Sequence, residues 1–370
     1  MYTLKDLSYQ KKLRSKDELI KHMGSFKLDM KLSVGIWYFT PGGGRFHPPY
    51  IRRKDIKERL KMAEEFAAYG ITGIEAHYPD EVNFENLDLY KDLEKKSNIK
   101  LVAVPFSHHY HTEFEFGSLS NPDPKVRKKA IKMTSEGLKL VKESQANCAI
   151  CWPGIEGYTY SLGTVFNWMW NDFEDAMAQA MDEQPGVRVA IEPKPYEPAN
   201  NNIYRTTAEG ILAAQRIEKK LKNSQNHKSL KQGQCLVGLN PEIGHVRMGY
   251  EDAAGAYALV CMEGRLAHVH LNSQPLGNYD QDLNVGVVEW QQAEAMLYAL
   301  KMAGYNEYFG IDINPERMPV KKAIQINSKV LHIMNDRIEN LPHKKLIEAY
   351  LDPSFHRGDI ELILAEAMRK

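Results

Sequence analysis

Two short apolar segments in the middle of the chain are each followed by side chains that bind hard metal ions. The segments are Cys235–Leu239 and Leu266–Leu271, and both have the length and composition of buried strands. Strand alternation puts the two histidines of the second segment on one side. Carboxylates and imidazoles without thiolates predict an oxygen-rich site for magnesium, manganese or cobalt rather than a structural zinc site. The candidate ligands in this stretch are Glu242, His245, His268, His270, Asp280 and Asp282.

Each of these residues has a simpler explanation when it is taken alone. A single carboxylate in a loop is usually solvated, and a single histidine beside a strand is more often a hydrogen-bonded core residue than a metal ligand. It is their common position, at or just past the C-terminal ends of apolar runs within Cys235–Asp282, that favours a metal site.

Length and charge limit the class of protein. The chain has 370 residues, which suffices for one large core and is a normal size for a single α/β barrel. Lys plus Arg equals Asp plus Glu at 48 each, and no basic block with interleaved aromatics is present in the sequence. We therefore expect a small, roughly neutral ligand, with neither nucleic acid nor a membrane as partner.

The N-terminal residues and the cysteines indicate a cytoplasmic protein. Met1–His22 is rich in Lys, Asp and Glu and has no hydrophobic signal core, and no apolar run reaches the length of a membrane span. Four cysteines are too few for a disulfide framework in a chain of this length. Cys148 and Cys151 would face opposite sides of one strand, so we interpret them as core residues.

Apolar runs alternate with helical patterns along the chain, which predicts a (β/α)8 TIM barrel with a short C-terminal helical tail. We divide the chain into a charged leader (1–31), the barrel (32–340) and the tail (341–370), and interpret Gln225–Gln234 as a surface loop. The predicted strands are Leu32–Phe39, Gly73–His77, Leu101–Phe106, Asn147–Trp152, Val187–Lys194, Cys235–Leu239, Leu266–Leu271 and Tyr308–Ile313. The predicted helices are Arg53–Tyr69, Pro124–Glu143, Gly163–Met181, Thr206–Leu221, Glu251–Met262, Glu289–Ala303, Pro319–Ile338, Lys344–Leu351 and Asp359–Arg369.

In such barrels the chemistry takes place at the C-terminal ends of the strands. The residues at the predicted strand ends are Trp37, His77, Phe106, Trp152, Glu192 with Lys194, Glu242 with His245, His270 and Asp312, and the opposite ends carry little of chemical interest. The loop Gly42-Gly43-Gly44 lacks the Lys and Ser/Thr of a P-loop, so we interpret it as a flexible active-site loop.

With these residues identified, the chain resembles the xylose isomerase family over about residues 33–335. Three runs carry most of the resemblance, and weaker matches include Trp37, His77 with Asp80, Phe106, Trp152 with Glu156, and Asp312. The three runs are Ala190-Ile191-Glu192-Pro193-Lys194-Pro195-Tyr196-Glu197-Pro198, Gly238-Leu239-Asn240-Pro241-Glu242-Ile243-Gly244-His245 and Tyr279-Asp280-Gln281-Asp282-Leu283.

The resemblance implies two divalent metal ions (Mn²⁺, Co²⁺ or Mg²⁺) bridged by Glu242 in each subunit of a homotetramer. The first ion would take Glu192, Glu242, His270 and Asp312, and the second would take Glu242, His245, Asp280 and Asp282. It implies that His77, oriented by Asp80, assists opening of the sugar ring. Lys194 would stabilise charge on the carbonyl oxygen, and Trp37, Phe106 and Trp152 would form apolar walls around the sugar. The implied reaction is aldose–ketose interconversion by a metal-assisted 1,2-hydride shift.

The sequence departs from the family in two places. Where xylose isomerases have Asp, this chain has His270, which resembles L-rhamnose isomerases and tilts the site toward manganese or cobalt. We therefore expect D-xylose or D-glucose as substrate first, and L-rhamnose or another rare sugar second. The loop Pro41–Pro49 also has a different spacing, and Phe46 is the candidate for its aromatic wall.

Other functions on the same barrel are open to the sequence. A metal-dependent hydrolase of the apurinic-site endonuclease type would need a zinc site richer in histidine and a basic surface, and the balanced charge disfavours it. A sugar-binding barrel without catalysis is also disfavoured, because every proposed ligand and Lys194 are present. The histidines His108, His109 and His111 look like a metal cluster, but we expect His109 and His111 not to be ligands.

Overall fold

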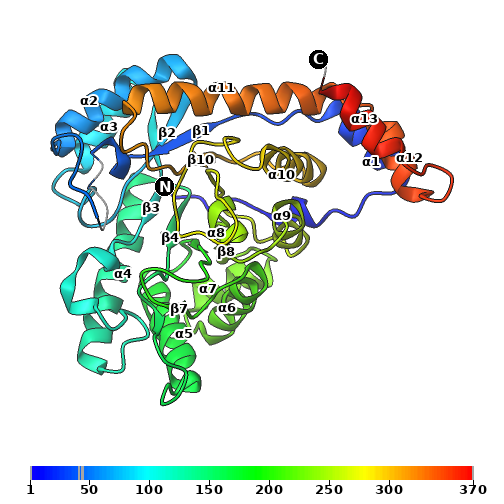
Figure 1. The fold of residues 1–370 in the computed structure, drawn as a ribbon. Helices are drawn as coiled ribbons and strands as arrows, with labels where there is room; N and C mark the ends of the chain where they lie inside the picture. The colour runs from blue at the N-terminus through cyan, green and yellow to red at the C-terminus, as the bar shows by residue number, and fades with distance from the viewer. Residues whose placement is uncertain (1, 41, 43–45, 369–370) are drawn as a thin grey trace.

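The computed structural model describes residues 2–40, 42 and 46–368, and its centre is a barrel of parallel strands surrounded by helices (Figure 1). The eight-stranded sheet has the order β8-β6-β4-β3-β2-β1-β10-β9, so neighbours in space follow the order of the chain. The predicted (β/α)8 barrel is confirmed. The strands are β1 (Leu32–Gly35), β2 (Ile71–Glu75), β3 (Lys100–Pro105), β4 (Cys148–Cys151), β6 (Val189–Ile191), β8 (Val237–Leu239), β9 (His270–Leu271) and β10 (Phe309–Ile311).

Backbone hydrogen bonds close the barrel between β8 and the segment that leads into β9. The amide of Leu239 donates to the carbonyl of Arg265 at 2.7 Å, and that of Ala267 donates to Leu239 at 2.9 Å. Farther along, the amide of His270 donates to Pro241 at 3.2 Å. Because the sheet is parallel and closed, the C-terminal ends of its strands meet around one rim, where a site can be assembled from distant parts of the chain.

The helices outside the barrel begin and end at residues that favour those positions. Asp55 caps α2 by accepting from the amide of Glu58, and Pro124 opens α4 behind the cap Asp123. Their apolar stripes pack on the outer face of the sheet. The helices around the barrel are α2 (Ile56–Phe66), α3 (Leu87–Ser97), α4 (Pro124–Ser144), α5 (Phe166–Glu183), α6 (Thr207–Lys220), α9 (Ala253–Met262), α10 (Trp290–Ala303) and α11 (Val320–Glu339).

The leader covers the N-terminal end of the barrel. The Gln10 side chain pairs with both backbone groups of Leu266, donating at 2.9 Å and accepting at 3.1 Å. Leu7 is buried beside the barrel-interior residues Cys148 and Cys235. Cys148 and Cys151 are buried free thiols, as expected of core residues, and burial raises the pKa of Cys148 to about 12. The leader thus fills one end of the barrel, which leaves the opposite rim for chemistry.

The structure contains helices that the sequence patterns did not predict. The segment expected as a surface loop, Gln225–Gln234, lies mostly in helix α7 (Ser224–Lys231), capped by Asn223 and anchored by the buried Asn226. Most residues of this segment are polar, so its sequence lacks the apolar stripe that predicts an amphipathic helix. Helix α8 (Ile243–Met248) is too short for a periodic pattern, and α1 (Lys16–Ser25) lies within the charged leader.

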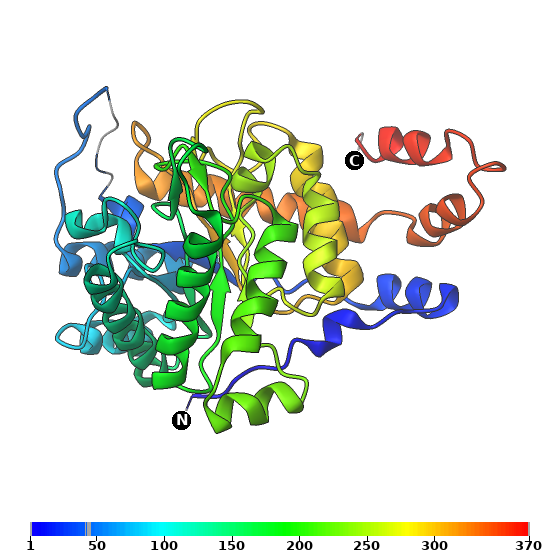
Figure 2. The ribbon, with the colours of Figure 1, turned by 90° about the horizontal axis from the view of Figure 1, so that it is seen from below.

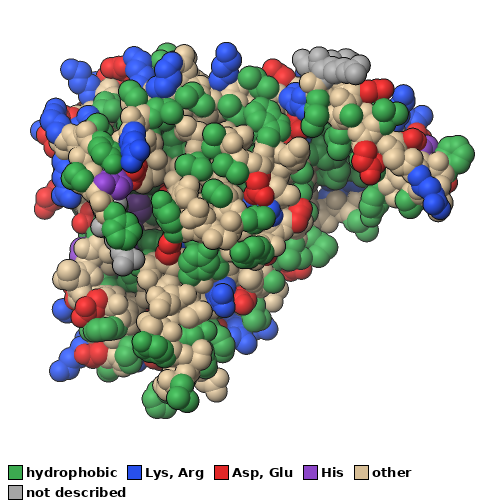
Figure 3. Space-filling model, in the orientation of Figure 1, with side chains coloured by type: hydrophobic (Ala, Val, Ile, Leu, Met, Phe, Trp, Pro, Cys, Tyr) green, Lys and Arg blue, Asp and Glu red, His purple; other side chains and the backbone are tan. Residues whose placement is uncertain are grey.

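The tail forms α12 (His343–Leu351) and α13 (Asp359–Ala367), which stand out from the barrel beside α1 (Figures 1 and 2). Lys16 of α1 lies 3.6 Å from Glu348 of α12. The space-filling view shows the tail as an arm set apart from the body (Figure 3). In the part of the chain that the structure describes, none of the helices has the length and apolarity that crossing a bilayer requires.

Candidate metal centre and active site

Four of the predicted ligands converge at the C-terminal rim of the barrel. His270 Nδ1 lies 3.1 Å from Asp312 Oδ2 and 3.2 Å from Glu192 Oε2. Together with Glu242, these residues offer four ligand atoms that all lie within 4.8 Å of one another. Glu192 follows β6, Asp312 follows β10 and His270 lies in β9, so the closed barrel brings them together. We call this group the first metal corner.

A second group shares Glu242 with the first. His245 lies on α8, three residues after Glu242, and its Nε2 is 3.3 Å from Glu242 Oε2 and 3.2 Å from Asp280 Oδ2. Asp282 belongs to the same region through Asn272, whose amide nitrogen donates to Glu242 at 2.7 Å and to Asp282 at 2.9 Å. We call Glu242, His245, Asp280 and Asp282 the second metal corner.

The charges of the two corners repel one another where no cation is bound. Burial, reinforced by the negative charges of Asp280 and Asp282, raises the pKa of Glu242 well above its ordinary value. Burial and Asp280 do the same to Asp282. Burial favours neutral His270, but Glu192, among other carboxylates, raises the pKa of its imidazole well above the ordinary value. The rim therefore requires positive charge among these side chains.

The donor atoms fit a pair of divalent metal ions. His270 Nδ1, His245 Nδ1 and Asp280 Oδ1 are buried and have no hydrogen-bond partner among the described residues. Buried polar atoms normally have partners, and metal ions supply them when hydrogen bonds do not. Imidazole and carboxylate ligands in oxygen-rich groups suit magnesium, manganese or cobalt. The structure brings together the residues that the sequence predicted as ligands.

Lys194 connects the second metal corner to the wall of the site. Its Nζ donates to Asp280 Oδ2 at 2.7 Å and lies 5.0 Å from the centre of the Trp152 ring. Burial alone would lower the pKa of Lys194, but the adjacent Asp280 raises it above its ordinary value. The lysine is therefore a fixed positive charge at the rim.

His77 lies two residues past the end of β2, and its partner is not Asp80, as we expected from the sequence. Its Nδ1 is 2.9 Å from Glu81 Oε2, and Arg59 donates to the other oxygen of Glu81 at 2.6 Å. Asp80 instead accepts from the Ser107 hydroxyl and lies 3.1 Å from His111 Nε2. The reason is a turn in which the amide of Glu81 donates to the carbonyl of His77 at 2.8 Å. This turn brings the side chain of Glu81, and not that of Asp80, back to the imidazole.

Two of the three side chains predicted as apolar walls lie at the rim, Trp37 beside His77 and Trp152 beside Lys194. Trp37 Nε1 donates to Asp312 Oδ1 at 3.0 Å, and its ring centre is 4.6 Å from that of His77. The ring of His109 lies between His77 and Trp152, with its centre 5.4 Å from that of the His77 ring and 4.8 Å from that of the Trp152 ring. Trp37, His77, His109 and Trp152 thus form a connected aromatic wall.

The prediction that Phe106 forms a third wall of the site was wrong. Its side chain is buried and stacks on His108 at 5.7 Å, on the outside of the barrel. A Cβ atom on Gly137 of α4 would lie 2.7 Å from the Phe106 ring, so the phenyl group packs directly against that helix. The chain turns outward after β3, and His109 reaches the rim in place of Phe106.

Sequence reasoning missed two residues of the site, one at the rim and one inside the barrel. His109 looked like a solvated loop residue, although it followed a predicted strand by only three positions. Glu75 lies inside the barrel and accepts from His268 and His270, and these imidazoles, acting against burial, lower the pKa of its carboxyl well below the ordinary value. The one available signal for Glu75 was a charged residue within the apolar run Ile74–Ala76.

Other candidates have different surroundings. His108 is buried between Ser118 and Thr134, away from the rim. Phe46 is exposed in the single chain. Of the Gly42-Gly43-Gly44 loop, Gly43 and Gly44 lie outside the described residues, as do Pro41 and Arg45 of the neighbouring loop.

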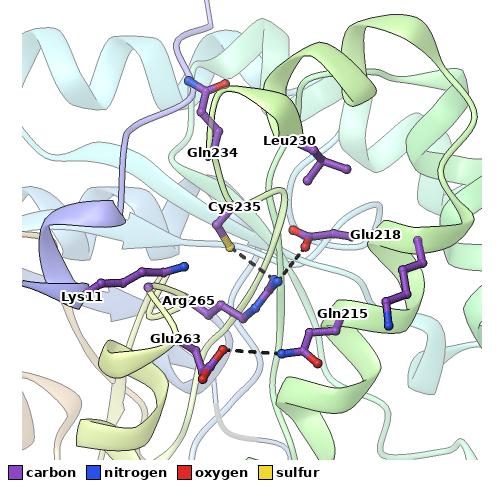
Figure 4. A pocket seen from close by; sticks show the side chains of 11 residues that line it. Lys11, Gln215, Glu218, Leu230, Gln234, Cys235, Glu263 and Arg265 are labelled. Carbon is purple, nitrogen blue, oxygen red and sulfur yellow. Dashed lines mark hydrogen bonds and ion pairs between the residues drawn. The ribbon is translucent and has the colours of Figure 1, made fainter.

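A hollow of about 460 Å³ lies at the opposite end of the barrel, around Cys235 (Figure 4). Arg265 there donates to Glu218 at 2.7 Å, and Gln215 donates to Glu263 at 3.5 Å. The guanidinium of Arg265 and the carboxylates of Glu218 and Glu263 thus already have partners within the hollow. The side chains whose chemistry suits metal binding or catalysis lie instead at the C-terminal rim.

Xylose isomerases are among the known proteins that this chain resembles in sequence. The chain is 26% identical over 265 residues to xylose isomerases of Thermus thermophilus and Thermus caldophilus, and the match covers 68% of this chain and 65% of each relative. The chain thus spans just under two thirds of the length of these relatives.

Solved structures with the same fold include sugar epimerases. A D-tagatose 3-epimerase-like protein superposes with a TM-score of 0.57 at 16% identity, covering 84% of this chain and all of that one. An L-ribulose 3-epimerase gives 0.56 at 14% identity, covering 84% of this chain and 96% of that one. At these identities the likeness shows the fold.

The family description called xylose isomerase-like TIM barrel matches residues 63–331, which is most of the chain and includes all the ligands of both metal corners. The chain belongs to the xylose isomerase-like TIM barrel family.

Proposed function

We propose that this protein is a metal-dependent aldose–ketose isomerase that acts by a 1,2-hydride shift. D-xylose and D-glucose are the first candidates for its substrate, and L-rhamnose or another rare aldose is the second. The observation that carries the proposal is the pair of ligand groups that share Glu242, with the ammonium of Lys194 bonded to Asp280 at their edge.

The reaction redistributes hydrogen within the sugar. One hydrogen moves with its electron pair from C2 to C1, and one proton moves from the C2 hydroxyl to the oxygen on C1, so that nothing is gained or lost overall. Two divalent metal ions would act as Lewis acids on the sugar oxygens and lower the pKa of a bound hydroxyl. Their ligands would be those of the two corners, with His270 favouring manganese or cobalt.

The other rim residues have tasks that match their chemistry. Lys194, held by Asp280, would donate a hydrogen bond to the carbonyl oxygen of the open sugar and stabilise negative charge there. His77, held by Glu81, would move a proton as the sugar ring opens. Trp37, His109 and Trp152 would cover the carbon face of the sugar and exclude water.

The experiment is removal and return of metal. Protein stripped with chelator should be inactive, and Mn²⁺ or Co²⁺ should restore conversion of one aldose in a panel of D-xylose, D-glucose, L-rhamnose and rarer aldoses. Glu192→Gln and Asp312→Asn should abolish turnover. Glu174→Gln, which changes a buried carboxylate on α5 that bonds Tyr204, should leave it near the original rate.

Several outcomes would count against the proposal. Full activity of Glu192→Gln would exclude the first metal corner. Metal binding without conversion of any sugar would favour a sugar-binding barrel that has lost catalysis. Interconversion of ketoses alone would indicate an epimerase, which is the activity named for several proteins of this fold.

The assembly and location belong to the same proposal. We expect a homotetramer, as the resemblance to xylose isomerases implies, and the tail exposes large apolar side chains that an assembly would cover, including Tyr350 and Phe355. A cytoplasmic location stays a prediction from the sequence.

A further inference from the structure

We infer that Glu75 is a positioning residue that fixes the direction of the His270 ring and supplies the negative charge that a histidine ligand lacks. The sequence analysis did not single out this residue. The inference rests on the proposed metal site, because it concerns how one ligand of that site is held.

Glu75 lies between two imidazoles in the interior of the barrel, and its side chain is 1% exposed. Its Oε2 is 3.0 Å from His270 Nε2, and its Oε1 is 2.9 Å from His268 Nε2. Ser33 of β1 donates to the same Oε1 at 2.7 Å. An ionised carboxylate only accepts hydrogen bonds, so both imidazoles donate from Nε2.

This contact decides what the opposite nitrogen of His270 can do. With the proton on Nε2, the neutral ring carries its lone pair on Nδ1, which faces carboxylate oxygens of Asp312 and Glu192 at 3.1 and 3.2 Å. A lone pair that faces two carboxylates is repelled unless a cation lies between them. Glu75 therefore aims a ligand atom at the first metal corner, as carboxylates behind metal-bound histidines do.

Formal charge gives the same answer independently. The five carboxylate ligands are Glu192, Glu242, Asp280, Asp282 and Asp312, and they carry five negative charges against four positive charges from two divalent ions. Glu75 adds a sixth negative charge. An aspartate at position 270 would also have made six, so the pair Glu75 and His270 keeps the total and moves one charge behind the imidazole.

The barrel leaves room for this arrangement at Gly310 of β10. A Cβ atom there would lie 2.6 Å from Glu75 Oε1, 2.8 Å from His270 Cδ2 and 2.9 Å from His268 Nε2. No side chain fits at that distance, so the glycine opens the space that the three groups occupy.

Glu75, His268 and His270 are close enough to hold an ion of their own, but their hydrogen bonds favour the positioning role. The two oxygens of Glu75 already accept from three donors, on Ser33, His268 and His270. A metal ion there would have to displace them.

The test is Mn²⁺ binding without sugar, measured from the electron spin resonance signal of free Mn²⁺ in titrations of chelator-stripped protein. Wild-type protein should bind two ions per chain. Glu75→Gln should weaken one of them by roughly 10- to 100-fold, the usual cost of losing a carboxylate behind a metal ligand, and leave the other almost unchanged. Glu174→Gln should change neither, although it also removes a buried carboxylate.

A double-mutant cycle separates positioning from a general loss of stability. In a His270→Asp background, Glu75 would face a carboxylate, so Glu75→Gln should there tighten Mn²⁺ binding instead of weakening it. Ser33→Ala, which removes one donor to Glu75, should weaken the same ion by a few-fold and serves as the test if Glu75→Gln does not fold.

The inference is overturned if Glu75→Gln, or Ser33→Ala in its place, binds both ions like the wild type, or if the loss is equal in both backgrounds. Absence of any Mn²⁺ binding by the wild type would overturn the proposed metal site itself. Metal binding with the expected effect of Glu75→Gln, but no conversion of sugars, would overturn only the proposed reaction.

Discussion

The two acidic residues that follow His77 hold different partners. Glu81 contacts His77 at 2.9 Å, whereas Asp80 contacts Ser107 and His111. A carboxylate that holds an imidazole also stabilises the positive charge that the ring gains when it takes up a proton. Proton movement by His77 should therefore depend on Glu81.

We expect Glu81→Gln to lower kcat by about 10- to 100-fold, part of the usual contribution of acid–base catalysis, with little change in KM. The matched variant Asp80→Asn should change kcat by less than about threefold. Steady-state rates on the best aldose with saturating metal check this. The reverse order of the two variants would show that the partner of His77 in the working enzyme is Asp80.

The convergence of the candidate ligands could be predicted from the sequence because the fold dictates their position. Glu192, His270 and Asp312 lie at or just past strand ends, and a closed parallel barrel brings all such ends to one rim. Glu75 could not be predicted, because its partner His270 is 195 residues away and the contact exists only after the barrel closes. The pairing of Glu81 rather than Asp80 with His77 depends on one local turn.

The segment after β3 sends neighbouring aromatic side chains in opposite directions. Phe106 packs outward against Gly137 of α4, and His109 reaches inward to Trp152. The alternation of a strand does not extend past its end, so the sequence alone could not show which ring would line the rim. Truncation of Phe106 should therefore affect mainly stability, and truncation of His109 should affect mainly substrate binding.

Phe106→Ala should lower the free energy of unfolding by about 3–5 kcal/mol, as is usual for a buried phenylalanine, and leave KM of the folded fraction unchanged. His109→Ala should raise KM several-fold with little loss of stability, because it removes part of the sugar wall. Urea unfolding and steady-state kinetics on both variants measure this. A raised KM in Phe106→Ala with unchanged stability would return Phe106 to the site.

Buried His108 ties the same segment to α4. Its nitrogens lie 3.0 Å from the Ser118 hydroxyl and 3.2 Å from that of Thr134, and burial lowers the pKa of its imidazole to about 3. The unfolded chain takes up a proton here as the pH falls below about 6.5, whereas the folded chain does not until about pH 3. His108 therefore contributes stability that is present above pH 6.5 and lost as the pH falls toward 3.

His108→Gln should flatten this part of the pH dependence. Between pH 7 and pH 4.5, the wild type should lose about 2.5 kcal/mol more of its unfolding free energy than the variant does. Urea titrations of metal-free protein at both pH values measure the difference, with His356→Gln on the exposed tail as control. Equal losses in wild type and His108→Gln would mean that His108 is protonated in the folded protein.

The alternation of strands and helices in the barrel could be predicted from the sequence, but its details could not. Eight apolar runs separated by helical patterns predicted the closed parallel sheet, because few other folds repeat in this way. Helix α7 has too few apolar residues to reveal itself, and its stability comes from caps and from the buried Asn226. Strand β9 (His270–Leu271) covers only the last two residues of its apolar run, and the start of that run joins β8 through one isolated bridge between Leu239 and Leu266.

The tail gives the molecule an arm whose apolar side chains lack cover in the single chain. Tyr350 and Phe355 are 76% and 80% exposed. We expect light scattering to give the mass of four chains for the full protein and of fewer chains after removal of residues 341–370. An unchanged mass would place the interfaces on the barrel instead.

The central claim is a hydride shift at a two-metal rim, and deuterium tests it most directly. The metal-loaded protein is incubated with its best aldose in D₂O, and the ketose is examined by NMR. A hydride shift keeps the migrating hydrogen away from solvent, so the account predicts a ketose with almost no deuterium at C1. Heavy incorporation at C1 would mean proton transfer through an enediol, and incorporation at C3 would mean epimerisation; either result would contradict the account.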